Sequence, residues 1–209
     1  MISHNYKCIF IHIAKCAGTS IETALGHFDG CAWKMYHGGQ DHRTIKQIKN
    51  RFVNKNERNP NCQLIVNQQQ FNDYFKFTFV RNPWDRLYSV YEYVKIHKDH
   101  KKEFNMLADT TFKEFLKSYI ESGKFFFHSQ LSYIQDVDGS IPLDFIGRFE
   151  NLQEDFDIVR QKLGTNKIPH LTHLNKSPNY GYKKAYDEET IELVRDFYKE
   201  EIEVLGYNY

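Results

Sequence analysis

The stretch from Cys8 to Glu22 constrains this chain more than any other. It begins as a run of apolar, β-branched and aromatic residues, Cys8 to Ile13, which is typical of a buried strand. The small residues that follow, Ala17 to Ser20, allow the backbone to approach a ligand closely. A helix is expected directly afterwards, from Thr19 to about His27. The stretch therefore predicts a strand-turn-helix unit.

The turn of this unit collects groups that bind anions. The first N–H groups of a helix have no acceptor within the helix. Here they lie beside the hydroxyls of Thr19 and Ser20 and the cation of Lys15, a set that favours a phosphate or a sulfate. The alternative is an ordinary turn in which Thr19 or Ser20 caps the helix and Lys15 points into water.

A nucleotide kinase is a second alternative for the same residues. The nucleoside-triphosphatase loop has the pattern Gly-x4-Gly-Lys-Ser/Thr, in which the lysine follows the last glycine. Lys15 precedes Gly18 in this chain, and this order argues against such a loop. The sequence also lacks a carboxylate for Mg²⁺ at the expected place.

The residues His12-Ile13-Ala14-Lys15-Cys16-Ala17-Gly18-Thr19-Ser20 resemble a loop of known enzymes. Sulfotransferases that use 3′-phosphoadenosine 5′-phosphosulfate bind its phosphosulfate in a loop such as His-Ile-Pro-Lys-Thr-Ala-Gly-Thr-Ser. The similarity is to the carbohydrate branch, with its heparan 2-O-type and bacterial family 2 members. Ala14 replaces the usual proline and Cys16 the usual threonine. The resemblance implies that the donor is held by Lys15, Ala17, Gly18, Thr19 and Ser20.

A second strand-turn-helix unit carries another anion-binding candidate. Its strand, Tyr74 to Val80, is followed by Arg81 at the edge where open α/β sheets place ligands. Pro83 suits the first turn of the next helix, and Ser89 lies about two turns along it. The spacing Arg81-x7-Ser89 resembles the element that binds the 3′-phosphate in the same sulfotransferases. A simple ion pair between Arg81 and Asp85 is the alternative.

The resemblance implies transfer of a sulfuryl group from this donor, a co-substrate, to a hydroxyl of an acceptor. Such a reaction needs positioning, charge stabilisation and a base, as phosphoryl transfer does. Lys15 suits the charge role, because its ammonium can lie on the bridging oxygen as the S–O bond breaks. Arg81 and Ser89 would hold the 3′-phosphate, for which a guanidinium offers a matched fork.

A histidine is the expected base, since its ordinary pKa is close to neutral pH. His12 lies in the predicted strand and faces a buried side, so a structural role is expected for it. His37 and His42 both fall between the two anion-binding elements. The segment Asp41-His42-Arg43-Thr44 resembles the Lys-His-x-Thr segment that carries the base of the family. We therefore prefer His42 over His37.

No metal is predicted. His170 and His173 have a spacing that suits a pair of ligands, but no Asp, Glu or Cys nearby completes the set. The leaving charge of the donor would be stabilised by Lys15 and by the start of the helix.

Strand and helix patterns alternate to the end of the chain. Another strand is expected within 141–150 and an amphipathic helix up to Leu163, with Ile158 facing inward. A single helix is expected over 187–205, with Phe197 facing inward. With the resemblance, which covers nearly the whole chain, this predicts an α/β protein. It would have a P-loop-like three-layer fold, with a mostly parallel central sheet flanked by helices, in one domain over residues 1–209.

Composition narrows the classes of partner. The 28 Lys and Arg residues nearly balance the 27 Asp and Glu residues, which argues against a non-specific binder of nucleic acid or anionic membrane. The four cysteines form no Cys-x-x-Cys pair, and reduced thiols are expected. With no apolar run that could span a membrane and no signal-peptide core, a cytoplasmic location is expected. A membrane-anchored Golgi enzyme without its anchor would look the same.

The expected acceptor is a glycan or another small molecule that bears a hydroxyl. Its identity is expected to depend on the segments 28–41 and 95–111. A non-catalytic module that binds the nucleotide is the alternative to an enzyme.

Overall fold

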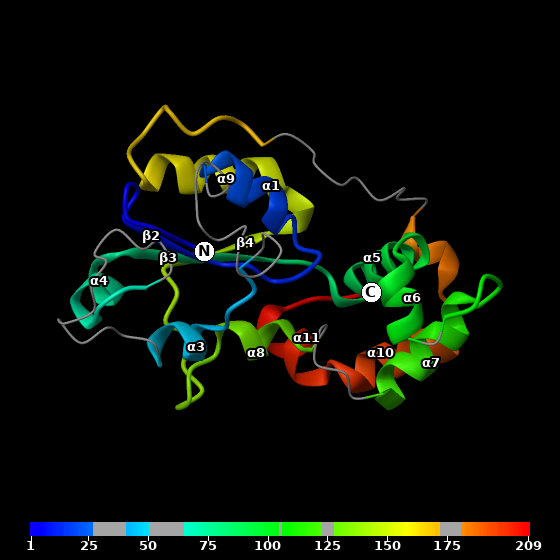
Figure 1. Cartoon of the computed structure of the whole chain (residues 1–209). Helices are drawn as coiled ribbons and strands as arrows, with labels where there is room; N and C mark the ends of the chain where they lie inside the picture. Colours follow the sequence, from blue (N-terminus) through cyan, green and yellow to red (C-terminus); the bar gives the residue numbers. More distant parts are fainter. Residues whose placement is uncertain (27–40, 51–64, 105, 123–127, 172–180) are drawn as a thin grey trace. The chain divides into compact units, whose positions relative to one another are not determined.

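The computed structural model of the chain describes residues 1–26, 41–50, 65–104, 106–122, 128–171 and 181–209 (Figure 1). The chain divides into two compact units. Unit 1 combines Met1–Val80 with Gln130–Leu174, and unit 2 combines Arg81–Ser129 with Asn175–Tyr209. A single domain over residues 1–209 stays a prediction.

A four-stranded sheet forms the centre of unit 1. Strand β1 pairs antiparallel with β2, whereas β2 with β3 and β3 with β4 are parallel. The strands, in their order across the sheet, are β1 (Ile2–Ser3), β2 (Cys8–Ile11), β3 (Phe75–Val80) and β4 (Phe145–Arg148). Helices α1 (Gly18–Ala24) and α9 (Leu152–Lys162) cover one face, and α3 (Ile45–Lys49) and α8 (Gln130–Ile134) lie on the other (Figure 1). This confirms the predicted α/β class with a mostly parallel sheet.

The two inner strands explain why the sheet is buried on both faces. All of β2 is buried, as is all of β3 except its first residue. A parallel strand covered on both faces is apolar at nearly every position, which is the pattern these segments have. The rings of Phe10 and Phe77 stack across the two strands with their centroids 5.1 Å apart. In β4, Gly147 leaves room for Phe79, because a Cβ there would lie 2.5 Å from the phenylalanine ring.

Short polar motifs begin two helices of unit 1. The Thr44 side chain accepts a hydrogen bond from the backbone of Gln47 and caps α3. Asn67 caps α4 (Gln68–Asp73) in the same way. Among the described residues, no helix combines the length and the apolar character that crossing a bilayer requires.

Unit 2 is helical. Asn82 caps α5 through its side-chain oxygen, and Pro83 occupies the first turn as expected. The Trp84 ring donates a hydrogen bond to the carbonyl of Ile191, which ties α5 to α10. The helices are α5 (Pro83–Ile96), α6 (Lys98–Glu103), α7 (Phe112–Ser122), α10 (Glu188–Phe197) and α11 (Lys199–Leu205), with a 3₁₀ turn at Tyr182–Ala185.

Two details of the predicted helices are wrong. The expected helix over 187–205 is interrupted at Tyr198, which is buried and separates α10 from α11. Phe197 is therefore 40% exposed. Ile158 is also 40% exposed, because Phe156 and Val159 already define the inner face of α9 and the helical rotation turns Ile158 away from it.

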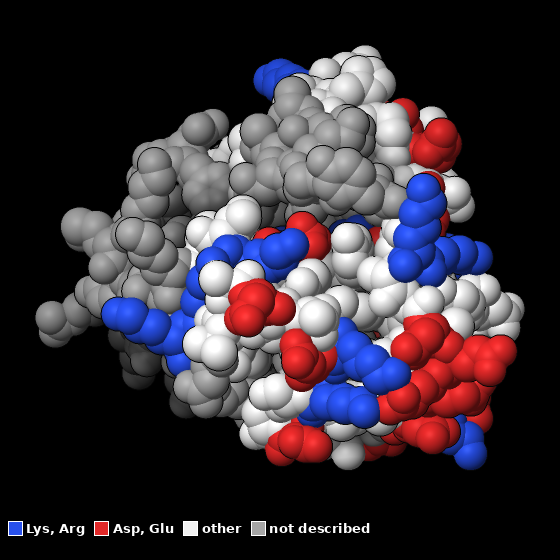
Figure 2. Space-filling model, turned by 90° about the vertical axis from the view of Figure 1, so that its right-hand side faces the viewer, with Lys and Arg blue, Asp and Glu red and all other residues white. Residues whose placement is uncertain are grey.

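Charged side chains of both signs share the face of the molecule that Figure 2 shows. On unit 2, Lys113 lies 2.9 Å from Asp187 and 2.6 Å from Glu189, which links α7 to the start of α10. Exposed pairs of this kind contribute little stability, on the order of 0–1 kcal/mol each.

Candidate active site

The turn between β2 and α1 has an unusual backbone. Lys15 and Ala17 both adopt left-handed conformations, with φ of 69° and 63°. Ala17 is the residue before the helix, and its carbonyl accepts hydrogen bonds from the N–H groups of Ser20 (3.0 Å) and Ile21 (3.2 Å). Two left-handed residues in three are costly for non-glycine side chains, and such strain is found most often at functional sites.

The predicted donor-binding residues lie around this turn. Gly18 and Ser20 are buried, whereas Lys15, Ala17 and Thr19 are partly exposed. Thr19 and Ser20 lie inside α1, so the alternative in which one of them caps the helix is wrong. The N–H groups of Gly18 and Thr19 precede the first hydrogen bond of the helix, which Ser20 makes. The turn thus provides the kind of donors that an anion needs.

The ring of His12 lies against the start of α1. A Cβ placed on Gly18 would be 1.9 Å from Cδ2 of His12, so only glycine fits at this position. On the same face of α1, one turn further, Oε1 of Glu22 lies 3.1 Å from Nδ1 of His12. The side chain of His12 is 2% exposed and that of Glu22 is fully buried. The contact does not count as a hydrogen bond, so it is an electrostatic one.

His42 lies beside His12, just before α3. Its Nδ1 is 3.0 Å from the carbonyl oxygen of His12, and the two imidazole centroids are 4.1 Å apart. Because a carbonyl only accepts, Nδ1 of His42 carries the proton and Nε2 keeps its lone pair. The predicted base is thus held in the tautomer that can accept a proton at Nε2.

Both histidines are neutral at pH 7. Burial, together with the positive amino terminus, lowers the pKa of His12 to about 3, against a smaller opposing effect of Asp41. Burial and the neighbouring His12 lower the pKa of His42 to about 4, although the charges of Glu22 and Asp41 act in the opposite direction.

Asp41 anchors the segment that carries His42. It is buried, and its carboxylate accepts hydrogen bonds from Nε of Arg43 at 2.8 Å and from the guanidinium nitrogen at 2.7 Å. The amino group of Met1 lies 3.2 Å away. Burial alone would raise the pKa of Asp41, but these two cations hold it well below its usual range. The carboxylate therefore stays ionised and fixes the turn before α3.

Sequence reasoning missed Glu22 and the anchoring role of Asp41. Glu22 stood at the end of the recognised loop, four residues after Gly18. That spacing puts both residues on one face of a helix and was the signal that could have identified the contact with His12.

Cys16 belongs to the turn and contacts α8. Its thiol donates to the side-chain oxygen of Gln130, at 3.3 Å. Cys8 and Cys16 are buried free thiols, which confirms the expectation of reduced cysteines for these two. Cys31 and Cys62 lie outside the described residues.

The second anion-binding candidate lies in unit 2. Nε of Arg81 is 2.8 Å from Oδ2 of Asp85, and both side chains are buried. Ser89, one turn further along α5, is 3% exposed. The ion pair is the contact that the simpler alternative predicted. Binding of a 3′-phosphate by Arg81 and Ser89 stays a prediction.

The other histidine candidates are only partly described. His37, with the rest of the segment 28–40, lies outside the described residues, and so does His173. His170 is exposed and contacts Asp157 at 3.4 Å. Within the described ranges, no three His, Cys, Asp or Glu side chains are grouped as metal ligands.

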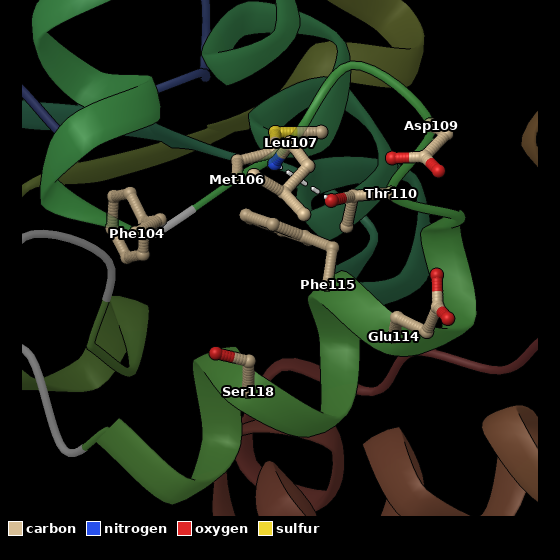
Figure 3. A pocket seen from close by; sticks show the side chains of 8 residues that line it. All are labelled: Phe104, Met106, Leu107, Asp109, Thr110, Glu114, Phe115 and Ser118. Atoms are coloured by element: carbon tan, nitrogen blue, oxygen red, sulfur yellow. Dashed lines mark hydrogen bonds between the residues drawn. The ribbon is translucent and has the colours of Figure 1, made fainter.

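Unit 2 also has a hollow of about 330 Å³ next to the start of α7 (Figure 3). Much of its lining comes from the segment 95–111, which was expected to influence acceptor specificity. Its lining combines apolar and phenylalanine side chains with oxygen-bearing ones. Thr110 accepts a hydrogen bond from the backbone of Leu107. The lining residues are Phe104, Met106, Leu107, Asp109, Thr110, Glu114, Phe115 and Ser118.

Comparison with known proteins gives the family. A family model described as "Sulfotransferase family" matches residues 1–208. A protein of Archaeoglobus fulgidus, described as uncharacterized, is 35% identical over 103 residues, which are 47% of this chain and 75% of that protein. Since the family match extends over nearly all of the sequence, including the turn after β2 and the Arg81 element, the chain belongs to the sulfotransferase family.

Proposed function

We propose that the chain transfers a sulfuryl group from 3′-phosphoadenosine 5′-phosphosulfate to a hydroxyl of a carbohydrate. Family membership supports sulfuryl transfer in general. The observation that carries the choice of donor is the turn after β2, where left-handed Lys15 and Ala17 precede the N–H groups of Gly18 and Thr19.

The proposed donor site uses this turn for the 5′-phosphosulfate. The N–H groups at the start of α1 and the hydroxyls of Thr19 and Ser20 hold the phosphate. The ammonium of Lys15 lies on the oxygen that bridges phosphorus and sulfur. Negative charge grows on that oxygen as the S–O bond breaks, so a fixed cation there lowers the barrier.

His42 acts as the base in this proposal. The acceptor hydroxyl gives its proton to Nε2 of His42 while its oxygen attacks sulfur, and the nucleotide 5′-phosphate leaves with the bonding electrons. The pKa of about 4 leaves Nε2 unprotonated at neutral pH. A bound anionic donor favours the protonated form of a nearby histidine and so raises its basicity during the reaction.

Arg81 and Ser89 are proposed to hold the 3′-phosphate. Asp85 contacts Nε of Arg81 and restrains the guanidinium at the start of α5. A restrained guanidinium can hold a phosphate with less loss of side-chain entropy.

Binding measurements test the donor. Calorimetry should show that 3′-phosphoadenosine 5′-phosphate binds at least tenfold more tightly than adenosine 5′-phosphate, and Arg81→Ala should abolish most of this preference. Arg195→Ala, at an exposed arginine in α10 of the same unit, is the matched control and should bind both nucleotides as the parent does. Equal affinities for the two nucleotides in the parent would rule out the assignment of Arg81 and Ser89.

The carbohydrate acceptor rests on the resemblance of the loop to the carbohydrate branch. A mass-spectrometric screen of glycans and other hydroxyl compounds tests the class.

A non-catalytic nucleotide-binding module is the second candidate. It would bind 3′-phosphoadenosine 5′-phosphate and transfer no sulfate to any acceptor in the screen. Turnover with a single acceptor is sufficient to reject it.

A further inference from the structure

The buried carboxylate of Glu22 has no part in the donor and base roles described above. It is fully buried, on the inner face of a helix that starts at the proposed donor site. Burying a carboxylate in a protein interior is costly unless other groups compensate its charge. A glutamate kept in this place therefore calls for an explanation in terms of the groups around it.

Glu22 faces an imidazole that itself faces His42. Oε1 of Glu22 lies 3.1 Å from Nδ1 of His12, and the rings of His12 and His42 are 4.1 Å apart. The backbone joins the same residues, because His42 donates to the carbonyl of His12. A carboxylate, an imidazole and the proposed base thus form one continuous array.

From this array we propose that Glu22 is a positioning residue that balances the proton which His42 accepts. The inference rests on the proposed function, in which His42 is the base. When the acceptor oxygen attacks sulfur and its proton moves to Nε2, the two histidines together gain one positive charge. The carboxylate of Glu22 faces that charge through His12 in a poorly solvated place, where electrostatic attraction is strong.

Among the described residues, Asp41 is another carboxylate close to His42. Asp41 lies beside it in the chain, and its carboxylate is held by Arg43 and by the amino terminus. Both Asp41 and Glu22 act to raise the pKa of His42, against the effects of burial and of His12. The amino terminus acts to lower the pKa of His12. Glu22, in α1, adds a second negative charge near His42.

The test compares Glu22→Gln with the parent protein in three quantities: kcat, nucleotide affinity and the dependence of kcat on pH. The amide has nearly the same shape and lacks the charge. We expect kcat at pH 7 to fall tenfold or more, the magnitude usual for groups that support a reacting residue. Affinity for 3′-phosphoadenosine 5′-phosphate should stay within about twofold, because Glu22 does not touch the nucleotide in this proposal. The acidic limb of kcat should move about one pH unit lower, since loss of a negative charge favours neutral His42.

Two further variants separate a charge effect from a packing effect. Glu22→Asp keeps the charge and should restore the acidic limb toward its parent position. Glu201→Gln changes an equally buried glutamate of α11 in unit 2, 1% exposed, and should leave the limb unchanged. If Glu22→Gln does not fold, an NMR titration of His42 in Glu22→Asp still decides. The shorter side chain moves the carboxylate away from His12, so the pKa of His42 should fall below that of the parent. An unchanged pKa of His42 in Glu22→Asp overturns the inference.

The outcomes distinguish this inference from the proposed function. One outcome overturns the role of Glu22 alone. In it, His42→Ala loses turnover, whereas Glu22→Gln keeps the kcat and the acidic limb of the parent. Full turnover in His42→Ala overturns both. A fall in stability or nucleotide affinity for Glu22→Gln without a moved limb assigns Glu22 to packing and also overturns the inference.

Discussion

The imidazole of His12 fills the space beside Gly18 that any side chain at position 18 would need, with Cδ2 only 1.9 Å from an ideal Cβ. The end of β2 and the start of α1 are therefore packed directly against each other. The glycine of the loop motif serves this contact, in addition to the close approach of a ligand that is proposed for it.

Gly18→Ala should destabilise the protein. The added methyl group must displace the buried ring of His12, and overpacking of this kind costs about 1–3 kcal/mol. Urea unfolding followed by circular dichroism measures the free energy of unfolding. The double variant Gly18→Ala/His12→Ala removes the clash, so its loss should be smaller than the sum of the two single losses. Strict additivity would show that the ring and the glycine are not coupled.

His42→Ala should lose turnover and keep nucleotide affinity. A general base contributes on the order of a hundredfold or more to the rate, whereas it does not hold the nucleotide in this proposal. His37→Ala is the necessary comparison, because His37 is the other loop histidine proposed from the sequence. Parent-like transfer by His42→Ala and failure of His37→Ala would move the base to His37. If both variants match the parent, the base lies elsewhere.

Lys15→Ala should affect both steps. The side chain is proposed to touch the donor itself, so its loss should weaken binding of the sulfated nucleotide and also slow transfer. Lys162→Ala, at an exposed lysine of α9 in the same unit, serves as control and should change neither quantity. A Lys15→Ala variant with parent affinity and parent kcat would contradict the assigned role.

Stability should decrease as the pH falls from neutrality. The folded-state pKa values of about 3 for His12 and about 4 for His42 lie below the ordinary 6.5. The unfolded chain therefore binds more protons than the folded one below about pH 6.5. Above that pH the free energy of unfolding includes the full contribution of the two neutral rings. Below it, this free energy declines by up to roughly 1.4 kcal/mol per pH unit for each histidine. Asp41, whose pKa is lowered, adds a further loss only below about pH 4.

Urea denaturation between pH 7.5 and 4.5 measures this dependence. His42→Asn should show a shallower decline than the parent, because one of the two titrating rings is absent. A free energy of unfolding that is flat over this range would contradict the burial of neutral histidines.

Transfer should not depend on a metal. Lys15 and the start of α1 are proposed to stabilise the leaving charge, which is a role that Mg²⁺ has in kinases. Turnover in EDTA should equal that in buffer with Mg²⁺. Activity that EDTA abolishes and Mg²⁺ restores would favour the nucleotide-kinase alternative.

The sequence alone was sufficient to predict the strands and the helix start that carry the candidate site. The apolar run Cys8 to Ile13 and the run before Arg81 each predicted a buried strand, and both strands are present in the central sheet. The start of the following helix was also predicted correctly, since Pro83 begins α5. These features depend on residues that are neighbours in the chain, and local propensity and hydrophobic periodicity report on such neighbours directly.

Only the tertiary structure decided which distant side chains share the site. His12 and His42 are 30 residues apart, and their contact depends on how α3 packs near the end of β2. Burial then lowers the pKa of both histidines, an effect that the ordinary pKa of histidine does not reveal. The sequence determined which groups were available for the chemistry, because residue types set hydrogen-bonding and charge. The tertiary structure decided their partners and protonation, because these depend on desolvation and on distances between segments that are far apart in the chain.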